Sequence, residues 1–314
     1  MRHSTVPLIP SGRQVVITSG DQTLTVVEVG GGIRTYTVGG KDVLDGYGDD
    51  EMCPSARGQL LVPWPNRLAG GTYEVDGMSL QVPLTEPEMH NAIHGLVRFV
   101  NWEVAEQASD GVVMAHRLHP QSGYPFVVDL AVEYHLAGDG LSVALTATNR
   151  GDRPCPFGAG AHPYLRLGRG VVDDLVLTAP ADTYYESDRD GIPVGRKAVD
   201  GTDFDFRQGR PIGNAQLNTA YTDLATGDDR RATVELSDAG GDHQVRLWLG
   251  EGYGYLMLFT GDTLPDEARR RRGLGVEPMT CAPNAFRSGD GLQVLDPGAS
   301  ARASWGIATT GFGT

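Results

Sequence analysis

Short apolar segments of strand length recur along the whole chain, and most of them stop at glycine or aspartate. The first four, between residues 14 and 47, are QVVITSG, TLTVVEVGGG, IRTYTVGG and KDVLDGY. Within such segments apolar and polar positions tend to alternate, which is the period-two pattern of a β-strand with one buried face. Segments of the same kind continue as far as GYLMLFTG, which begins at residue 254. The pattern predicts antiparallel strands joined by tight turns.

Two hairpins are predicted most clearly. Residues 70–84 read GGTYEVDGMSLQVPL, with Asp76 and Gly77 at the centre. Asp-Gly is a favoured pair for a two-residue hairpin turn, because both positions must adopt positive φ. The strand-like segments 127–136 and 141–149 are separated only by AGDG, and they predict a second, longer hairpin.

Amphipathic helices are nearly absent from the pattern. The best candidate is a short turn at residues 265–272, which is too polar to be a core helix. No Ser/Pro-rich linker, low-complexity tract or fixed-period repeat divides the sequence. We therefore expect an all-β protein, with one large antiparallel β-sandwich domain that covers residues 1–314.

Composition and charge narrow the choice of partners. Glycine (43) and proline (19) are abundant for 314 residues, which fits many strands joined by turns. The formal net charge is −14, and a field of this sign repels nucleic-acid phosphates and anionic membrane surfaces. We therefore expect a neutral small molecule as partner rather than nucleic acid or membrane, although a local basic pocket could override the mean charge.

The cysteines and the N-terminal segment predict a cytoplasmic protein. Cys53, Cys155 and Cys281 are far apart and odd in number, which favours three reduced thiols over a disulfide or metal framework. Residues 1–13 lack the apolar core of a signal peptide. No stretch approaches the ~18 apolar residues of a membrane span.

Residues 269–272 are four consecutive arginines in an acidic chain, with Asp266 and Glu267 close by. We interpret the run as a solvated loop. A phosphate-binding role would require the run to face a pocket.

Four segments interrupt the strand pattern with polar residues set among proline, glycine and aromatic residues. They cover residues 62–71, 89–98, 158–167 and 275–286, and they carry Arg67, His94, His162 and Glu277 respectively. Two histidines that titrate near neutral pH, one carboxylate and one bidentate donor form a set suited to proton transfer on a hydroxylated substrate. Taken singly, each has a simpler explanation, such as a turn cap for Glu277 or a surface ion pair for Arg67.

Motifs for other kinds of chemistry are missing from the sequence. It contains no Walker loop, dinucleotide fingerprint, HExxH or Gly-x-Ser-x-Gly. The glycines at residues 30–32 precede a strand-like segment rather than a helix, so they predict a turn. We expect neither a cofactor nor a metal.

In this order, the segments PNRLAGGTYEVDG, HNAIHG, AHPYLRL and GVEPMT resemble the aldose 1-epimerase (galactose mutarotase) family. The resemblance extends from about Arg57 to Phe286, and its specificity lies in the ordered set rather than in any single motif. It implies a large antiparallel β-sandwich with a sugar site in a cleft on its concave face. The implied activity is the interconversion of the α and β anomers of a free aldose, such as glucose or galactose.

The resemblance also implies a role for each matching residue. The ring opens when the C1 hydroxyl loses a proton and the ring oxygen gains one, so two proton carriers are needed and no cofactor is required. Glu277 would take the proton from the hydroxyl, His162 would protonate the ring oxygen, and His94 would lie near that oxygen. The sugar-binding groups would be Arg67, Asn91, Tyr164 and Asp223, with Asp223 in AYTDL the loosest match.

Three alternatives remain open at this stage. HPY is followed here by Leu-Arg-Leu, and Glu277 by Pro-Met, and these departures from the usual family pattern leave the sugar undefined. One alternative is an epimerase for a hexose 6-phosphate, with Arg57, Arg98 and Arg166 as phosphate-binding candidates. Another is a non-catalytic sugar-binding or regulatory module, which is expected to have lost its acid or its base. The third, a polysaccharide-lyase or glycosidase accessory domain, would share only the fold.

Overall fold

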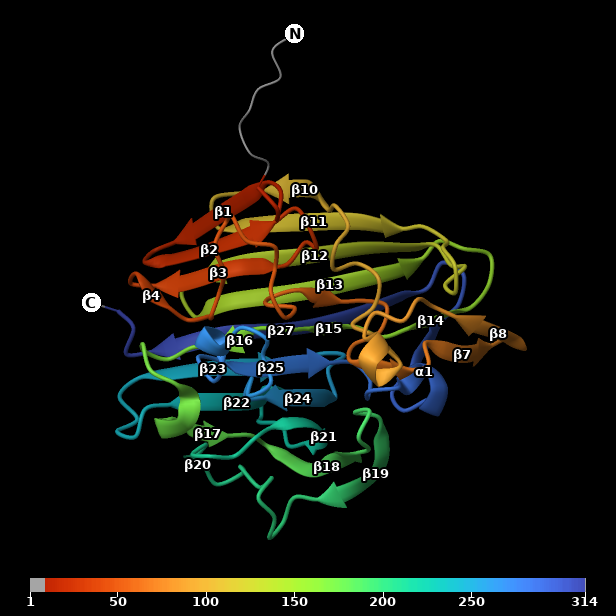
Figure 1. Cartoon of the computed structure of the whole chain (residues 1–314). Coiled ribbons are helices and arrows are strands. Elements are labelled where there is room, and N and C mark those ends of the chain that lie inside the picture. The colour runs from red at the N-terminus through yellow and green to blue at the C-terminus, as the bar shows by residue number, and fades with distance from the viewer. Residues whose placement is uncertain (1–8, 314) are drawn as a thin grey trace.

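The computed structural model describes residues 9–313, and most of its regular structure is β-strand (Figure 1). Its two largest sheets have nine and eight strands, and their strands pair in antiparallel fashion. The prediction of an all-β antiparallel sandwich is confirmed. Residues 1–8, which belong to the segment examined for a signal peptide, lie outside the described residues.

The nine-stranded sheet forms one layer of the sandwich. In spatial order its strands are β10 (Glu103–Gln107), β11 (Gly111–Leu118), β12 (Val128–Ala137), β13 (Gly140–Asn149), β27 (Ser300–Thr310), β23 (Gln244–Leu249), β22 (Ala232–Ser237), β17 (Val176–Thr178) and β20 (Arg210–Pro211). Along β12 buried positions alternate with more exposed ones, as the period-two sequence pattern predicts.

The eight-stranded sheet carries most of the loops with polar residues. Its order is β19 (Pro193–Ala198), β18 (Ala181–Ser187), β21 (Asn218–Leu224), β24 (Tyr255–Phe259), β25 (Leu274–Met279), β15 (Gly160–Ala161) and β5 (Leu60–Leu61), with β16 (Tyr164–Leu165) also paired to β25. The central strand β25 is buried along its whole length. A polar side chain on β25 is therefore held in a dry, rigid setting.

Smaller sheets extend the two layers. A four-stranded sheet contains β1 (Gln14–Ser19), β2 (Gln22–Val27), β3 (Ile33–Val38) and β4 (Lys41–Asp42), and three two-stranded sheets pair β6 (Arg67–Ala69) with β9 (Asn91–Ile93), β7 (Thr72–Val75) with β8 (Met78–Gln81), and β14 (Cys155–Phe157) with β26 (Gln293–Leu295). Figure 1 shows β1–β4 beside the β10–β13 end of the large sheet, where β1 contacts β11 and β12.

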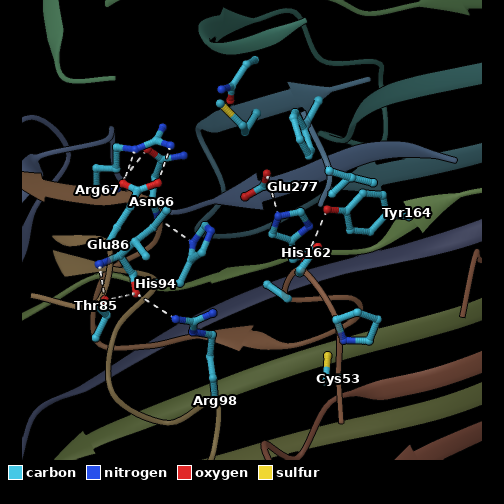
Figure 2. A pocket seen from close by; sticks show the side chains of 18 of the residues that line it. Cys53, Asn66, Arg67, Thr85, Glu86, His94, Arg98, His162, Tyr164 and Glu277 are labelled. Atoms are coloured by element: carbon cyan, nitrogen blue, oxygen red, sulfur yellow. Dashed lines mark hydrogen bonds and ion pairs between the residues drawn. The ribbon is translucent and has the colours of Figure 1, made fainter. Parts of the chain in front are cut away.

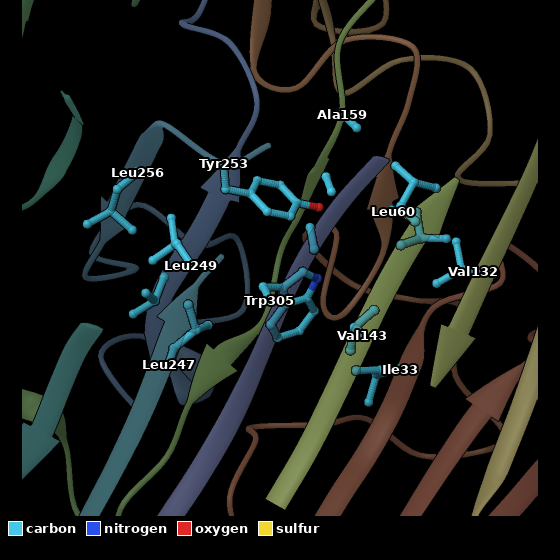
Figure 3. Packing of buried hydrophobic residues seen from close by; sticks show 14 of the residues in the cluster. Ile33, Leu60, Val132, Val143, Ala159, Leu247, Leu249, Tyr253, Leu256 and Trp305 are labelled. Atoms are coloured by element: carbon cyan, nitrogen blue, oxygen red, sulfur yellow. The ribbon is translucent and has the colours of Figure 1, made fainter. Parts of the chain in front are cut away.

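One hydrophobic cluster joins the two large sheets (Figure 3). Trp305 on β27 and Val143 on β13 are cross-strand partners in the nine-stranded sheet, and Leu256 on β24 belongs to the eight-stranded sheet. Full burial of an aliphatic side chain contributes roughly 1.5–3 kcal/mol. The sheets are therefore held face to face by apolar contact.

Both predicted hairpins are present. Asp76 and Gly77 have φ of 48° and 73°, as a two-residue turn between β7 and β8 requires. β12 and β13 are paired from end to end.

Helical structure is limited to short segments. The predicted turn at residues 265–272 contains a 3₁₀ helix at Glu267–Arg269, and the other helical segments are Pro87–Met89, Val172–Asp174 and α1 (Ala285–Ser288). No helix between residues 9 and 313 is long and apolar enough to cross a membrane. Cys53, Cys155 and Cys281 are free and buried, as expected.

The interpretation of the four arginines as a solvated loop holds for Arg270, which is 40% exposed and pairs with Glu267, and is wrong for the other three. Arg271 forms ion pairs with Asp173 and Asp262, at 2.7 and 2.6 Å, and Arg272 with Asp45 at 2.8 Å. Asp173 and Asp45 are 98 and 227 positions from their partners, so the sequence did not reveal these two pairings. These ion pairs hold the segment before β25 against the segments that carry the three acids.

Asp45 is the centre of a buried charge network. Its fully buried carboxylate accepts hydrogen bonds from Arg57 (3.1 and 3.2 Å), Arg166 (3.0 Å) and Arg272 (2.8 Å). The Arg57 side chain is only 2% exposed. Because one carboxylate faces three guanidinium groups, it ties the segments that follow β4 and β16 to the segment that precedes β25.

We predict that Asp45→Asn destabilises the protein by about 3–5 kcal/mol, because it leaves buried guanidinium groups without a counter-charge. Urea unfolding followed by circular dichroism measures the change in free energy. The control is Asp129→Asn, which removes the partner of Arg117 and Arg150 at the surface and should lower stability far less. Equal effects of the two substitutions would show that the Asp45 network does not support the fold.

Candidate active site

Most of the residues selected from the sequence meet in one cleft (Figure 2). Its volume is about 460 Å³, within the usual range for small-molecule sites. The predicted residues that line it are Arg67, His94, His162, Tyr164 and Glu277. They come from four separate parts of the chain, which the folding of the eight-stranded sheet and its loops brings together.

The floor of the cleft is formed by the eight-stranded sheet. Glu277 on β25 lies directly opposite Met257 on β24, and both side chains line the cleft. Asn218, at the start of β21, lines it as well. Strands supply a rigid base for Glu277, whereas His94 and His162 extend from loops.

His162 and Glu277 form a close, buried pair. The His162 Nε2 atom lies 3.2 Å from Glu277 Oε1, and the two side chains are 6% and 3% exposed. His162 Nδ1 and Glu277 Oε2 have no hydrogen-bond partner within the described structure. Buried polar atoms are nearly always hydrogen-bonded, so these two atoms indicate binding positions for a polar ligand.

Burial sets the protonation of this pair. Desolvation raises the pKa of Glu277 to about 8, against a smaller lowering by Arg67. Desolvation lowers the pKa of His162, and the charges of Arg57 and Arg98 lower it further. Both shifts disfavour a charged group in the dry cleft. At neutral pH the empty pair therefore holds one proton, shared between Glu277 and His162.

His94 is held as a fixed hydrogen-bond donor. Its Nδ1 atom accepts the backbone N–H of Asn66 at 3.1 Å, so the proton of the neutral ring must be on Nε2. Burial holds the pKa of His94 well below its usual range, and His162, Arg98 and Arg67 add to the effect. His94 therefore stays neutral and offers Nε2–H to a ligand.

Glycine is required at position 95, directly after His94, for a steric reason. Gly95 has a φ of 69°, and a Cβ there would lie 2.0 Å from the Val62 carbonyl oxygen. Only glycine fits this close approach. The contact fixes the loop that carries His94 against the segment before Arg67.

Tyr164 lines the cleft and packs its ring against His162. Its ring stacks on the His162 ring, with centroids 4.8 Å apart and planes at 18°. The Arg57 guanidinium lies over the same tyrosine ring at 4.4 Å. The Tyr164 hydroxyl donates to the Ser55 carbonyl at 3.1 Å, so a hydrogen bond from this hydroxyl to a sugar is not a feature of the geometry.

Arg67 is largely occupied by an acidic partner. Its Nε and Nη2 atoms donate to Glu86 at 2.7 and 2.8 Å. The side chains are 11% and 14% exposed, so this is a partly buried bidentate pair rather than a surface ion pair. Nη1 is the part of the guanidinium that is not engaged with Glu86.

Two predicted sugar-binding residues do not reach the cleft. Asn91 is buried, and its amide donates to the Asp190 carbonyl at 2.7 Å and to Glu86 at 3.4 Å, so it supports the loop that holds Glu86. Asp223 is exposed on β21, and it follows Asn218 by five residues, or roughly 16 Å of strand. Asp223 is a candidate only through the family resemblance, which does not show which end of β21 faces the cleft.

Several cleft residues were not selected from the sequence. Asn66 lies within the PNR motif and holds His94, and Glu86 lies five residues before Asn91 and holds Arg67. Asn66 and His94 are 28 positions apart, and Arg67 and Glu86 are 19 positions apart. No local sequence pattern reveals contacts over such separations. Arg98, named only as a phosphate candidate, also lines the cleft.

The cleft also contains the ligand types of a divalent metal site. His94, His162 and Glu277 each offer an atom within 4.8 Å of the others. A neutral imidazole binds metal through a bare nitrogen, and the only bare nitrogen of His94 accepts the Asn66 N–H. The tautomer of His94 therefore favours hydrogen bonding over metal binding.

Comparison with known proteins agrees with this geometry. The family model described as aldose 1-epimerase matches residues 13–307. The chain belongs to the aldose 1-epimerase family. It is 33% identical over 298 residues to the uncharacterized Escherichia coli protein YihR, covering 95% of this chain and 93% of that protein. It is 28% identical over 211 residues to an aldose 1-epimerase of E. coli, covering 65% and 60% of the two chains.

Solved structures of the family share the fold. A GalM/aldose epimerase homologue from Caenorhabditis elegans has a TM-score of 0.84 at 19% identity, covering 95% of this chain and 98% of that one. A galactose 1-epimerase from Lactobacillus acidophilus has a TM-score of 0.80 at 20% identity, covering 94% and 93%. These likenesses confirm the expected fold, and the family model over residues 13–307 confirms the expected membership of the aldose 1-epimerase family.

We predict that Glu277 titrates with a midpoint near pH 8 in the folded protein, because burial raises its pKa from the ordinary value of 4.5. Carbon-13 NMR of glutamate carboxyl groups measures the midpoint, and the signal absent from Glu277→Gln assigns it. A midpoint near 4.5 would mean that water reaches the carboxyl group and that the pair does not hold a shared proton.

Proposed function

We propose that this protein catalyses the interconversion of the α and β anomers of an aldose, with Glu277 and His162 as the proton carriers. The observation that carries the proposal is the buried contact of 3.2 Å between His162 Nε2 and Glu277 Oε1. Family membership supports isomerase chemistry of this class. Both side chains line the cleft, and each has a buried polar atom without a hydrogen-bond partner among the described residues, which supports a hydroxylated ligand.

The proton count of the pair matches the count that the reaction needs. For ring opening, Glu277 is ionised and takes the proton of the C1 hydroxyl, while protonated His162 gives its proton to the ring oxygen. The pair then consists of a neutral acid and a neutral imidazole, which is the form favoured by burial. The two forms contain the same single proton, so a turnover exchanges no proton with solvent.

The remaining cleft residues have supporting roles in this proposal. His94 donates from Nε2 to the ring oxygen or to a neighbouring hydroxyl, and the free Nη1 of Arg67 donates to another hydroxyl. Preorganised donors of this kind stabilise charge as it develops in the transition state. Positioning of the sugar between the two proton carriers adds to the rate.

A non-catalytic sugar-binding module fits the cleft less well. Keeping a carboxyl group and an imidazole together in a dry site costs desolvation free energy, and simple sugar binding does not require that cost. The proposed substrate is a neutral free hexose, such as glucose or galactose. The alternative is a hexose 6-phosphate, for which Arg98 in the cleft lining is the candidate phosphate-binding residue.

We predict that Glu277→Gln and His162→Asn each lower kcat by about 10²–10⁴-fold, because each removes one proton carrier. Polarimetry of freshly dissolved α-D-glucose and α-D-galactose measures the rate. The effect on KM should be small by comparison, and calorimetry should still detect sugar binding.

The matched control is Glu74→Gln, an equal change at an exposed position of the β7–β8 hairpin, which should keep the full rate. Full activity of Glu277→Gln would remove Glu277 as the base. A large rise in KM with unchanged kcat for His162→Asn would make His162 a binding residue only.

We predict that the catalysed rate falls above about pH 8 and is level between there and mildly acidic pH. Above the pKa of Glu277 the pair loses its shared proton, so Glu277 is ionised while His162 is neutral and no acid remains. Below it the pair keeps this proton, and the lowered pKa of His162 delays uptake of a second one. The test is a pH–rate profile corrected for spontaneous mutarotation, and a rate that rises steadily through pH 9 would contradict the shared-proton pair.

A further inference from the structure

The acid and base groups of the cleft lie close around one point. His94, His162 and Glu277 each offer a side-chain nitrogen or oxygen, and these atoms lie within 4.8 Å of one another. Figure 2 shows the three side chains together. At this spacing three groups can contact the substituents of a single carbon atom. In the proposed function that carbon is C1 of the sugar, which carries the two oxygens that exchange protons with the protein.

A cleft that interconverts two anomers has to accept a hydroxyl group at either position on C1. In one anomer the hydroxyl occupies the first position and hydrogen the second, and in the other anomer the two are exchanged. Glu277 is the base for both anomers in the proposed function, so its carboxylate reaches an oxygen at either position. Both positions on C1 therefore have room for an oxygen within reach of the same base.

The tetrahedral intermediate in the hydrolysis of an aldonolactone fills both positions at once. Water adds to the C1 carbonyl group of the lactone, and the adduct is a sugar ring with two oxygens on C1 besides the ring oxygen. This adduct differs from a cyclic aldose only by an oxygen in place of the hydrogen on C1. In its collapse the bond from C1 to the ring oxygen breaks, as it does in the ring opening of an aldose.

We propose that the protein also hydrolyses the 1,5-lactones of aldoses, with Glu277 and His162 as the proton carriers. This inference rests on the proposed function, because it uses the same pair of side chains. The substrates are water and a neutral lactone, and the product is the aldonic acid. Lactones of this kind form when the C1 hydroxyl of an aldose is oxidised, so an oxidation at C1 is the class of reaction that supplies the substrate.

The reaction balances with water as the only co-reactant. The Glu277 carboxylate takes one proton from water while the water oxygen bonds to C1, and the carbonyl electron pair moves onto the carbonyl oxygen. The bond from C1 to the ring oxygen then breaks as the carbonyl group re-forms, and protonated His162 gives its proton to the ring oxygen. The pair ends as a neutral acid and a neutral imidazole, so it holds one proton throughout. The new carboxylic acid loses its own proton to solvent after release.

His94 supplies a donor for the charge that develops on the carbonyl oxygen. Its Nδ1 atom accepts the backbone N–H of Asn66 at 3.1 Å, so Nε2 carries the proton and the ring donates while it stays neutral. Fixed donors in a dry site stabilise the oxyanion that forms when a carbonyl group is attacked. In mutarotation the forming hydroxyl receives its proton from Glu277, so the lactone reaction depends more strongly on His94.

The cleft has room for the attacking water beside a sugar ring. Its volume of about 460 Å³ is typical of sites for drug-sized ligands, which are larger than one sugar ring. A water molecule takes up roughly 30 Å³. Met52 and Phe99 line the cleft and are both exposed, so the cleft is open to solvent on their side. Water can therefore be replaced after each turnover.

The experiment measures hydrolysis of D-glucono-1,5-lactone at mildly acidic pH, below the pKa of Glu277, with a pH-stat that records the acid released. We expect kcat to exceed the rate constant of spontaneous hydrolysis by about 10²–10⁴-fold, the usual contribution of general acid–base catalysis. Mutarotation of α-D-glucose is followed by polarimetry with the same preparation. The lactone should inhibit mutarotation competitively, with an inhibition constant equal to its own KM, because both substrates occupy one cleft.

Substitutions separate the shared pair from the oxyanion donor. Glu277→Gln and His162→Asn should lower kcat for lactone and glucose by factors that agree within about threefold, because both reactions use the same pair. His94→Phe should lower kcat for the lactone about tenfold more than kcat for glucose, and His94→Gln, which keeps an N–H donor, should recover part of the loss. The matched control, Glu74→Gln at an exposed position, should keep both rates. Circular dichroism establishes that each variant is folded.

The two activities can fail separately. If glucose is epimerised while the lactone is hydrolysed no faster than in buffer, the lactonase activity is overturned and the proposed function stands. Lactone hydrolysis that persists at the full rate in Glu277→Gln overturns it as well, because another site is then responsible. If the lactone is hydrolysed through Glu277 while no aldose is epimerised, the proposed function fails and lactone hydrolysis is the activity of the cleft. If neither substrate reacts, both proposals are overturned.

Discussion

The buried carboxylate of Asp45 fixes the framework on which the candidate active site is built. It holds Arg57, Arg166 and Arg272, and Arg57 in turn lies over the Tyr164 ring that stacks on His162. One carboxylate cannot neutralise three guanidinium groups, so positive charge remains behind the imidazole. That charge disfavours a second proton on His162 and helps keep the pair with Glu277 at one proton. The network therefore orients the His162 ring and adds to the lowering of its pKa that burial causes.

The cleft contains buried polar atoms that lack hydrogen-bond partners at the place where a ligand is expected to bind. His162 Nδ1 and Glu277 Oε2 are buried and unpartnered, and each such atom costs roughly 1–3 kcal/mol. The apolar contact between the two large sheets offsets this cost elsewhere in the fold. A sugar that hydrogen-bonds to both atoms recovers this free energy. Hydrogen bonds that these two atoms lack in the folded protein can thus contribute to the free energy of binding a hydroxylated ligand.

The sequence allowed good prediction of whatever depends on local pattern. The strands, the Asp76–Gly77 turn and the ordered motifs around His162 and Glu277 follow from alternation, turn chemistry and resemblance. Contacts between distant segments could not be foreseen: Asp45 and Arg272 are 227 positions apart. The same limit explains Asp223, because a motif resemblance does not show which end of a strand meets the cleft. It also explains Glu86, whose pairing with Arg67 depends on how two loops fold together.

Net charge and local charge act on a ligand over different distances. At physiological ionic strength the Debye length is ≈ 8 Å, so most of the acidic surface is screened from a ligand inside the cleft. A guanidinium group in direct contact is not screened, and partial burial strengthens its hydrogen bonds. The total of −14 therefore bears on which molecules approach the protein. The guanidinium groups of Arg67 and Arg98 in the lining bear on which groups of a bound molecule are held.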